Sequence, residues 1–310
     1  MILTVTVNPA LDYTVRLDRL DIGKRAKYRD PSIDPAGKGI NVSRMAHRLG
    51  AATLALGFAA GPTGTLLRQR LDEEAVPHDL LPTPGLTRIN VTLLTGPEGA
   101  ATHLHGPGSP IDSDDLKLLM ARASEHLSRA TILVLSGSLP PGVPPEAMVS
   151  LVTLAKSRRV LTLVDAESAM LAAAIGAGAD LVKPNSLEAG EFLRREVAGV
   201  EAAVTAAREI RARGVGTVIV TLRADGAVAV DGTGAWHVQP PKDLVVRAIG
   251  AGDSFAAGLA VALSRGLRLP EALRLAAASG AATARHSGTG LGSRAEVDEL
   301  QSQVQVCQLP

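Results

Sequence analysis

The chain carries two kinds of apolar segment that alternate along most of its length. A first strand is expected at residues 2–7. Continuous apolar runs at residues 132–135, 160–164 and 217–220 are typical of strands buried on both faces of a parallel sheet. Between them, apolar residues recur at helical spacing. This order predicts an α/β fold with a mostly parallel sheet, right-handed crossovers and helices on both faces. The helices expected are 40–49, 112–129, 145–157, 186–195, 201–213, 253–265 and 271–284.

A second pattern, strict alternation of polar and apolar residues, interrupts this order. Tyr13, Val15 and Leu17 alternate with polar neighbours, and the same period returns at residues 89–93. Such strands have one wet face. We therefore expect residues of about 11–35 and 86–105 to form a small separate sheet, a lid on a single domain of residues 1–310. Residues 227–230 and 235–238 flank a glycine-rich turn and are expected to pair as a hairpin.

Charge and cysteine content exclude several classes of partner. The 310 residues contain 32 Lys and Arg against 31 Asp and Glu, a net charge of +1, so no overall field attracts nucleic acid or a membrane surface. The one cysteine, Cys307, excludes an internal disulfide and fits a reducing compartment. Residues 2–7 run into Asn8-Pro9, which indicates a strand with a stop rather than a signal peptide. A cytoplasmic location is expected.

The segment Gly250-Ala251-Gly252-Asp253 is the first candidate for chemistry. Its small residues allow successive N–H groups to converge on an anion, and the apolar spacing that follows predicts a helix beginning here. A helix N-terminus favours negative charge, so a phosphoryl group fits. Asp253 beside it would accept a proton from the attacking hydroxyl. The alternative is an ordinary glycine turn with Asp253 as the helix N-cap.

A second glycine-punctuated turn, Gly37-Lys38-Gly39-Ile40-Asn41, also opens a helix. Lys38 is a point charge and Asn41 both donates and accepts hydrogen bonds, a pair suited to phosphate and hydroxyl groups. The spacing is not that of a P-loop. Taken alone, a turn of this kind is more often purely structural than ligand-binding.

With both turns in place, the chain resembles the ribokinase-like carbohydrate kinases, within them the 1-phosphofructokinase and tagatose-6-phosphate kinase branch. The resemblance runs nearly end to end, and several matches in one order are more specific than any single motif. The matching segments are Asn8-Pro9-Ala10-Leu11-Asp12, residues 37–41, Thr87-Arg88-Ile89-Asn90-Val91, residues 136–142, Lys183-Pro184-Asn185 with Glu188, residues 250–253, and Gly288-Thr289-Gly290-Leu291.

The resemblance implies a three-layer α/β/α sandwich with a small β-sheet lid, ATP as co-substrate and Mg²⁺. It implies a catalytic group of Asp253 with Gly250, Ala251 and Gly252. It implies that Lys38 and Arg88 meet the phosphate of the sugar. The substrate-binding residues implied are Asp12, Gly37, Lys38, Asn41, Arg88 and Ser138. The ATP-binding residues implied are Lys183, Asn185, Glu188, Thr221, Arg223, Gly226, Gly250 and Gly252.

Within this set Glu188 is expected to hold magnesium through water, since magnesium keeps waters and takes few carboxylates. For Asn185 and Glu188 a structural alternative is open: Asn185 caps the helix that follows, and Glu188 is an ordinary acid of its first turn.

Several positions depart from the pattern of the family. Ala36 stands where glycine is usual, and Thr92 stands where lysine is common. Thr221-Leu222-Arg223 replaces a Ser-Leu-Gly run, Arg247-Ala248 replaces a polar residue and threonine, and residues 165–168 differ from an Asp-x-Ser-Gly run. Most of these changes fall on the nucleotide side. Arg223 either binds ATP phosphates or covers a reduced site.

The function expected is ATP-dependent phosphorylation of fructose 1-phosphate to fructose 1,6-bisphosphate. Tagatose-6-phosphate or fructose-6-phosphate kinase is the alternative of the same class, because residues that bind hydroxyls and a phosphate do not name the sugar. A sugar-phosphate-binding protein with weakened catalysis is the alternative of another class. A homodimer joined through the lids is expected, because a small open sheet exposes edges and an apolar face.

Overall fold

The computed structural model describes residues 1–96, 100–165, 168–241, 249–286 and 288–310. Within these residues the larger sheet has ten strands, parallel from β5 to β11 and antiparallel from β11 to β14. The mostly parallel sheet and the hairpin are confirmed. In spatial order the strands are β14 (Gln305–Leu309), β13 (Ala235–Gln239), β12 (Ala227–Val230), β11 (Thr217–Thr221), β10 (Leu181–Val182), β9 (Leu161–Asp165), β8 (Ile132–Ser136), β1 (Ile2–Thr6), β4 (Thr53–Ala60) and β5 (His78–Thr83).

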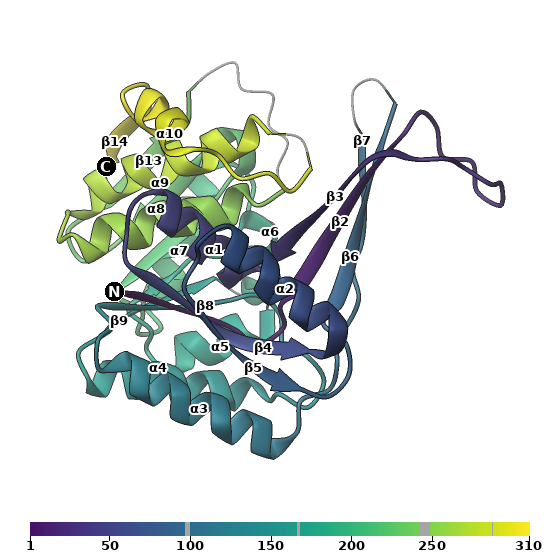
Figure 1. The fold of residues 1–310 in the computed structure, drawn as a ribbon. Helices are drawn as coiled ribbons and strands as arrows, with labels where there is room; N and C mark the ends of the chain where they lie inside the picture. Colours follow the sequence, from purple (N-terminus) through teal and green to yellow (C-terminus); the bar gives the residue numbers. More distant parts are fainter. Residues whose placement is uncertain (97–99, 166–167, 242–248, 287) are drawn as a thin grey trace.

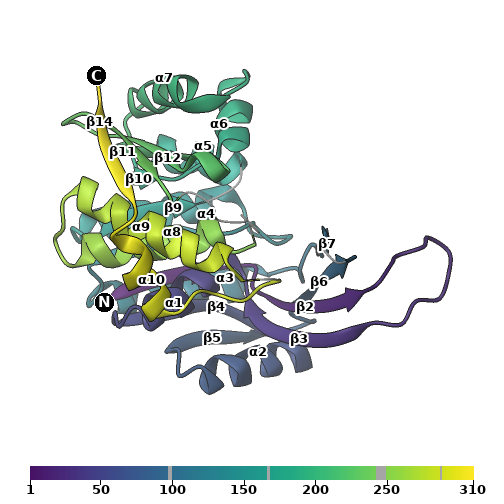
Figure 2. The same ribbon diagram turned by 90° about the horizontal axis from the view of Figure 1, so that it is seen from above.

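Helices cover both faces of this sheet, as a three-layer sandwich requires (Figure 2). One face is covered by α1 (Lys38–Arg48), α8 (Ala251–Ser264), α9 (Leu269–Ala284) and α10 (Arg294–Gln301). The other is covered by α3 (Ser113–Leu127), α4 (Pro145–Ser157), α5 (Ser168–Gly176) and α7 (Gly199–Arg211). The remaining helices are α2 (Gly61–Glu73), against β4 and β5, α6 (Ser186–Leu193), against α5 and α7, and the short 3-10 turn η1 (Arg223–Asp225).

The two cores follow from residue size and pattern. Every residue of β1 and β8 is buried, as continuous apolar runs between two helical layers must be. Helices α8 and α9 pack closely through small residues. A Cβ on Gly258 would lie 2.7 Å from the carbonyl oxygen of Leu275, so any larger residue would force the two helices apart. This close packing fixes the start of α8, where the Gly250 turn lies.

The lid is a separate four-stranded sheet in the order β3 (Arg29–Ala36), β2 (Ala10–Leu17), β6 (Arg88–Thr95) and β7 (Ala100–Leu104). It projects from one side of the body (Figure 1). Strand β2 pairs in parallel with β6, so that Asp12 stands opposite Asn90, and antiparallel with β3. The expected small separate sheet is confirmed.

Some elements were not expected from the pattern. Helix α2 begins at Gly61-Pro62 and has a weakly apolar face, and the strands β4, β5 and β14 also lie outside the expected set. The expected helices are present with ends shifted by a few residues, because apolar spacing marks the buried face better than the first turn. None of the helices in the described ranges has the length and apolar composition needed to span a bilayer.

Candidate active site

Two neighbouring cavities lie at the carboxyl ends of the parallel strands, where open α/β sheets bind ligands. The charged cavity has a volume of about 490 Å³ and the apolar cavity about 550 Å³. Asn185, Thr221 and Gly252 line both, so the two cavities meet there. The charged cavity is also lined by Asp12, Gly37, Lys38, Asn41, Arg88, Ser138, Lys183, Glu188, Gly250 and Asp253. The apolar cavity is also lined by Arg223, Gly226, Ala251 and Phe255.

The first turn of helix α8 lines the charged cavity and forms a candidate anion-binding site. Gly250 is its N-cap, with a φ of 74° that favours glycine, and no side chain among the described residues caps the first turn. The N–H groups of this turn are thus available to an anion. Asp253 lies in the first turn and not at the cap, so the alternative that makes it the N-cap is wrong.

Asp253 is buried and its carboxylate has one strong hydrogen-bond donor. The Asn41 amide donates from Nδ2 to Oδ2 of Asp253 at 2.8 Å. Burial, followed by the nearby negative charge of Asp165, raises the pKa of Asp253 to about 6, although Lys38, Asn41 and Lys183 act to lower it. A carboxylate with a pKa close to neutral is suited to accept a proton and give it up again.

Two lysines and two acids form a charge network across the floor of the charged cavity. Lys183 Nζ lies 3.0 Å from Asp165 Oδ2, and both side chains are buried. Lys38 Nζ lies 3.8 Å from Asp165 Oδ1 and 3.7 Å from Glu188 Oε1. Lys38 therefore faces both acids within the charged cavity. Lys183, expected on the ATP side, lines the charged cavity and pairs with Asp165.

The segment 185–188 forms a reciprocal helix cap. Asn185 Oδ1 accepts from the Glu188 N–H at 2.9 Å, and Glu188 Oε2 accepts from the Asn185 N–H at 2.8 Å. The structural alternative, in which Asn185 caps the helix and Glu188 belongs to its first turn, is thus confirmed for Asn185 Oδ1 and Glu188 Oε2. It leaves Glu188 Oε1 turned toward Lys38 and the cavity. The cap fixes the carboxylate, so one segment can both begin α6 and present an oxygen to a ligand.

On the lid side, Asp12 and Arg88 are held by neighbours. Asn90 Nδ2 donates to Asp12 Oδ1 at 2.8 Å. Burial raises the pKa of Asp12, and the hydrogen bond from Asn90 partly opposes this rise. Arg88 donates from Nη1 to the carbonyl of Gly106 at 2.9 Å and from Nη2 to that of Asn8 at 3.0 Å. These two bonds fix the guanidinium at the rim of the charged cavity.

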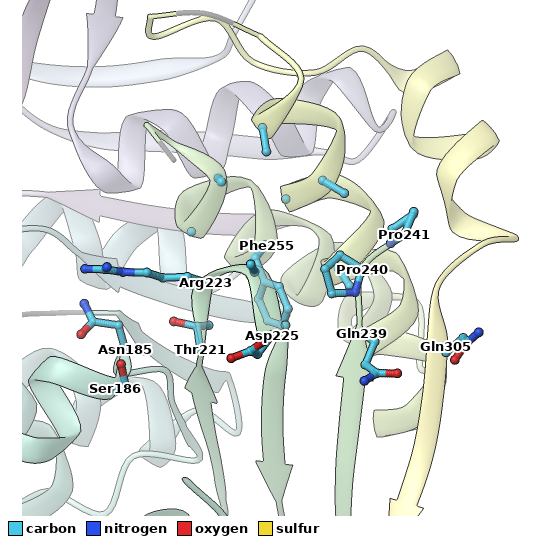
Figure 3. Close-up of a pocket in the computed structure, with 18 of the residues that line it drawn as sticks. Asn185, Ser186, Thr221, Arg223, Asp225, Gln239, Pro240, Pro241, Phe255 and Gln305 are labelled. Carbon is cyan, nitrogen blue, oxygen red and sulfur yellow. The ribbon is translucent and has the colours of Figure 1, made fainter. Parts of the chain in front are cut away.

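The apolar cavity lies between the end of β11, the carboxyl end of β13, and helices α8 and α9 (Figure 3). Phe255 contributes a ring, and Arg223 extends along the cavity toward the end at which Asn185 lies. Arg223 is the only basic side chain among the described residues that line it, and it makes no hydrogen bond or ion pair with any described residue. Its φ of 55° is in the left-handed region, which costs about 1 kcal/mol for a residue other than glycine.

Sequence reasoning gave no role to three residues of the site. Asp165 is the last residue of the buried strand β9, Asn90 lies two residues after Arg88 on one strand face, and His105 follows the lid strand β7. The first two carried a usable signal, the carboxyl end of a parallel strand and the period of two. Asn8, for which the sequence predicted no role of its own, donates from Nδ2 to Ser138 Oγ at 3.1 Å.

The residues present fit a magnesium ion held mostly by water and phosphate. Glu188 Oε1 is not used by the helix cap, and within the described ranges no three His, Cys, Asp or Glu side chains form a metal-binding group. A site with one or two carboxylates is typical of magnesium bound together with a nucleotide. The departures at Ala166-Glu167 and Arg247-Ala248 lie outside the described residues.

The site and fold together define a class. Residues 6–296 match the model of the pfkB family of carbohydrate kinases, and the chain belongs to that family. It is a sugar kinase, a phosphotransferase that uses ATP with Mg²⁺.

Individual relatives are similar over the full length. The chain is 35% identical to a 1-phosphofructokinase of Bacillus subtilis, with 100% of both chains covered. It is 32% identical to a D-tagatose-1-phosphate kinase of Bacillus licheniformis, again over 100% of both. The structure of phosphofructokinase-2 of Escherichia coli with substrates and products has a TM-score of 0.90 at 30% identity, covering 97% of this chain and 98% of the other. The inhibited form of that enzyme is described as tetrameric.

Proposed function

We propose that the protein phosphorylates fructose 1-phosphate at its 6-hydroxyl, giving fructose 1,6-bisphosphate. One observation carries the proposal: a buried carboxylate with a pKa near 6 lies in the first turn of an uncapped helix, where the charged and apolar cavities meet. Curated 1-phosphofructokinases among the relatives support this sugar. Kinases of tagatose phosphate and of fructose 6-phosphate are the alternative, since relatives with those names are nearly as similar.

In this proposal the sugar occupies the charged cavity. Asp12 and Asn41 hold its hydroxyls, with Gly37 and Ser138 lining the wall, and the guanidinium of Arg88, positioned by its two carbonyl bonds, binds its phosphate. Asp253 accepts the proton of the attacking hydroxyl. That oxygen then attacks the terminal phosphorus of ATP, the bond to the ADP oxygen breaks, and the N–H groups of residues 250–252 stabilise the charge on the moving group.

Lys38 takes a different place in this scheme from the one that the sequence suggested. Its Nζ lies 3.8 Å from Asp165 Oδ1 and 3.7 Å from Glu188 Oε1, the acid proposed to hold Mg²⁺ through water, which supports a role beyond the sugar phosphate. We propose that Lys38 meets the phosphoryl group in transfer. The ammonium group of Lys183 offsets the negative charge of Asp165, and so limits the effect of that charge on Asp253.

ATP occupies the apolar cavity, with its base toward Phe255 and its phosphates toward Asn185. Thr221 and Gly226 line its path, and Arg223 binds the phosphates, because a lone cation in a left-handed conformation with no described partner suits a polyanionic ligand. Glu188 holds Mg²⁺ through water. The intact base and the open cavity argue against the alternative of a binding protein with weakened catalysis.

Three further proposals concern the whole molecule. All 310 residues form one kinase domain, and it acts in the cytoplasm, as the single cysteine and the balanced charge favour. Two copies associate through their lids. In support, Ile89 and Leu104 on the lid strands are 47% and 54% exposed, and every residue of β7 is exposed.

A panel of acceptors tests the substrate. Release of ADP is measured with fructose 1-phosphate, fructose 6-phosphate, both tagatose phosphates and fructose. The expected result is the highest kcat/KM for fructose 1-phosphate. A higher kcat/KM for a tagatose phosphate or for fructose 6-phosphate would identify that sugar phosphate as the substrate and leave the proposed mechanism unchanged. No turnover with any of them would favour the binding protein.

A further inference from the structure

The Asn41 amide must present its NH₂ group, and not its oxygen, to Asp253, and the proposed mechanism does not explain what fixes this orientation. Its Nδ2 faces Asp253, but an amide rotated by half a turn has almost the same shape and would turn its oxygen toward the carboxylate. Two oxygens facing each other would remove the hydrogen bond and repel. The ionised carboxylate selects this orientation by itself, but a protonated Asp253 does not, so a second group that holds Asn41 Oδ1 on the opposite side is needed during turnover.

Arg44, one helical turn later on α1, provides that group. Its Nη1 lies 3.4 Å from Asn41 Oδ1. A guanidinium can only donate and an ionised carboxylate can only accept, so an amide placed between them has one favourable orientation. Arg44 donates to the oxygen of Asn41, and the amide nitrogen of Asn41 donates in turn to Asp253. The orientation is set from the Arg44 side even while Asp253 carries a proton during turnover.

The Arg44 guanidinium is itself fixed in direction. Its side chain is 2% exposed, Nε donates to Glu74 Oε2 at 2.8 Å, and Nη2 donates to Glu74 Oε1 at 2.5 Å. The Nη1 group that faces Asn41 also donates to the carbonyl of Pro35 at 2.8 Å. Glu74 is the C-cap residue of α2, and Pro35 is the penultimate residue of lid strand β3. A planar fork bound on two edges leaves the side chain little freedom.

We propose that Arg44, held by Glu74, is a positioning residue that orients the Asn41 amide toward the catalytic base and ties that orientation to the root of the lid. The inference rests on the proposed role of Asp253. It adds a residue that touches neither substrate and acts only through Asn41.

The consequence appears in the pH dependence of the reaction. Asp253 faces Lys38 and Asn41 from α1, Asp165 from β9, and Lys183 beyond β10. Lys38, Asn41 and Lys183 all favour the ionised form of Asp253, whereas Asp165 opposes it. Without Arg44 only Asp253 itself selects the orientation of the amide, so the amide is held less firmly and donates less often. The carboxylate is then less stable, so a higher pH is needed to keep the base ionised.

The test compares Arg44→Met with Arg122→Met. Arg122 makes a comparable pair of contacts to Asp79 at 2.8 Å, on α3 and away from both cavities. For Arg44→Met we expect the acid limb of the kcat profile to move up by about half to one pH unit and kcat at neutral pH to fall by about 10-fold. The KM for ATP should stay unchanged. The Arg122 variant should keep the wild-type profile.

A double-mutant cycle separates positioning from general destabilisation. In an Asn41→Ala background, Arg44→Met should lower kcat by less than about 2-fold, because its effect passes through the missing amide. Arg44→Lys keeps the charge and should restore part of the wild-type pH dependence of kcat. If Arg44→Met does not fold, Arg44→Lys takes its place in the test. An unmoved acid limb, or losses that add in the double variant, would overturn the proposal. If Asp253→Asn itself kept its kcat, the base would be wrong instead.

Discussion

Replacing Asp253 by Asn is expected to make the protein more stable and much less active. The side chain keeps its size, so the packing of α8 is retained. The carboxyl group, however, has a pKa of about 6 in the folded protein against an ordinary value of 3.8, because it is buried near Asp165. The native state therefore binds a proton that the unfolded state has already released over this interval of pH.

The magnitude follows from that difference. About two pH units at 1.36 kcal/mol each correspond to roughly 3 kcal/mol. A raised carboxyl pKa gives stability that is present below the unfolded value and is lost as the pH rises through the folded value. The wild type loses this contribution between about pH 4 and pH 6, whereas the amide variant does not. The variant should thus be more stable by about 3 kcal/mol above pH 6, with little difference near pH 4.

The assay is urea unfolding of both proteins at several pH values, together with ADP release at neutral pH. Without its proton acceptor the variant should lose about 10²- to 10⁴-fold in kcat, with sugar binding largely kept. A stability difference that does not change with pH would contradict the electrostatic account of Asp253. A variant with kcat near that of the wild type would remove Asp253 from the mechanism.

Three other changes test separate parts of the site. Glu188→Gln keeps a side chain that can cap α6 but removes its charge, so the magnesium concentration for half-maximal rate should rise by about 10-fold or more; an unchanged magnesium titration would sink this assignment. Arg223→Gly should raise the KM for ATP by about 10-fold while stabilising the fold by about 1 kcal/mol, since glycine adopts its φ of 55° readily; an unchanged KM would mean that Arg223 does not bind the nucleotide. Leu104→Asp puts a charge on the exposed lid face and should convert a dimer into monomers by light scattering at micromolar concentration; a monomeric wild type would refute the lid interface.

The sequence predicted the parts of the fold that depend on local pattern. Continuous apolar runs such as residues 132–135 can only be buried between two layers, and the alternation at Tyr13, Val15 and Leu17 can only belong to a sheet with one wet face. The helix start at residues 250–253 was predicted for the same reason, since small residues precede a regular apolar face.

What remained open depends on contacts between distant segments. Nothing local to Arg44 shows that Glu74, thirty residues later, takes its guanidinium. The contact of Lys38 with Asp165 and Glu188 likewise arises only when α1 docks across the ends of the strands. The Asn185-x-x-Glu188 spacing suits both a helix cap and a magnesium site, and the structure shows that the capping contacts leave one oxygen for the second role.

The central claim is that the charged cavity accepts a sugar that already carries a phosphate, and one comparison tests it most directly: kcat/KM for fructose 1-phosphate and for fructose, in the wild type and in Arg88→Leu. We expect the wild type to prefer fructose 1-phosphate. Arg88→Leu should then cost about 2–4 kcal/mol, roughly 30- to 700-fold, with the phosphorylated sugar and much less with fructose. Equal losses with both sugars would show that Arg88 does not bind the phosphate. A wild type that prefers fructose would contradict the claim itself and identify a kinase of neutral sugars.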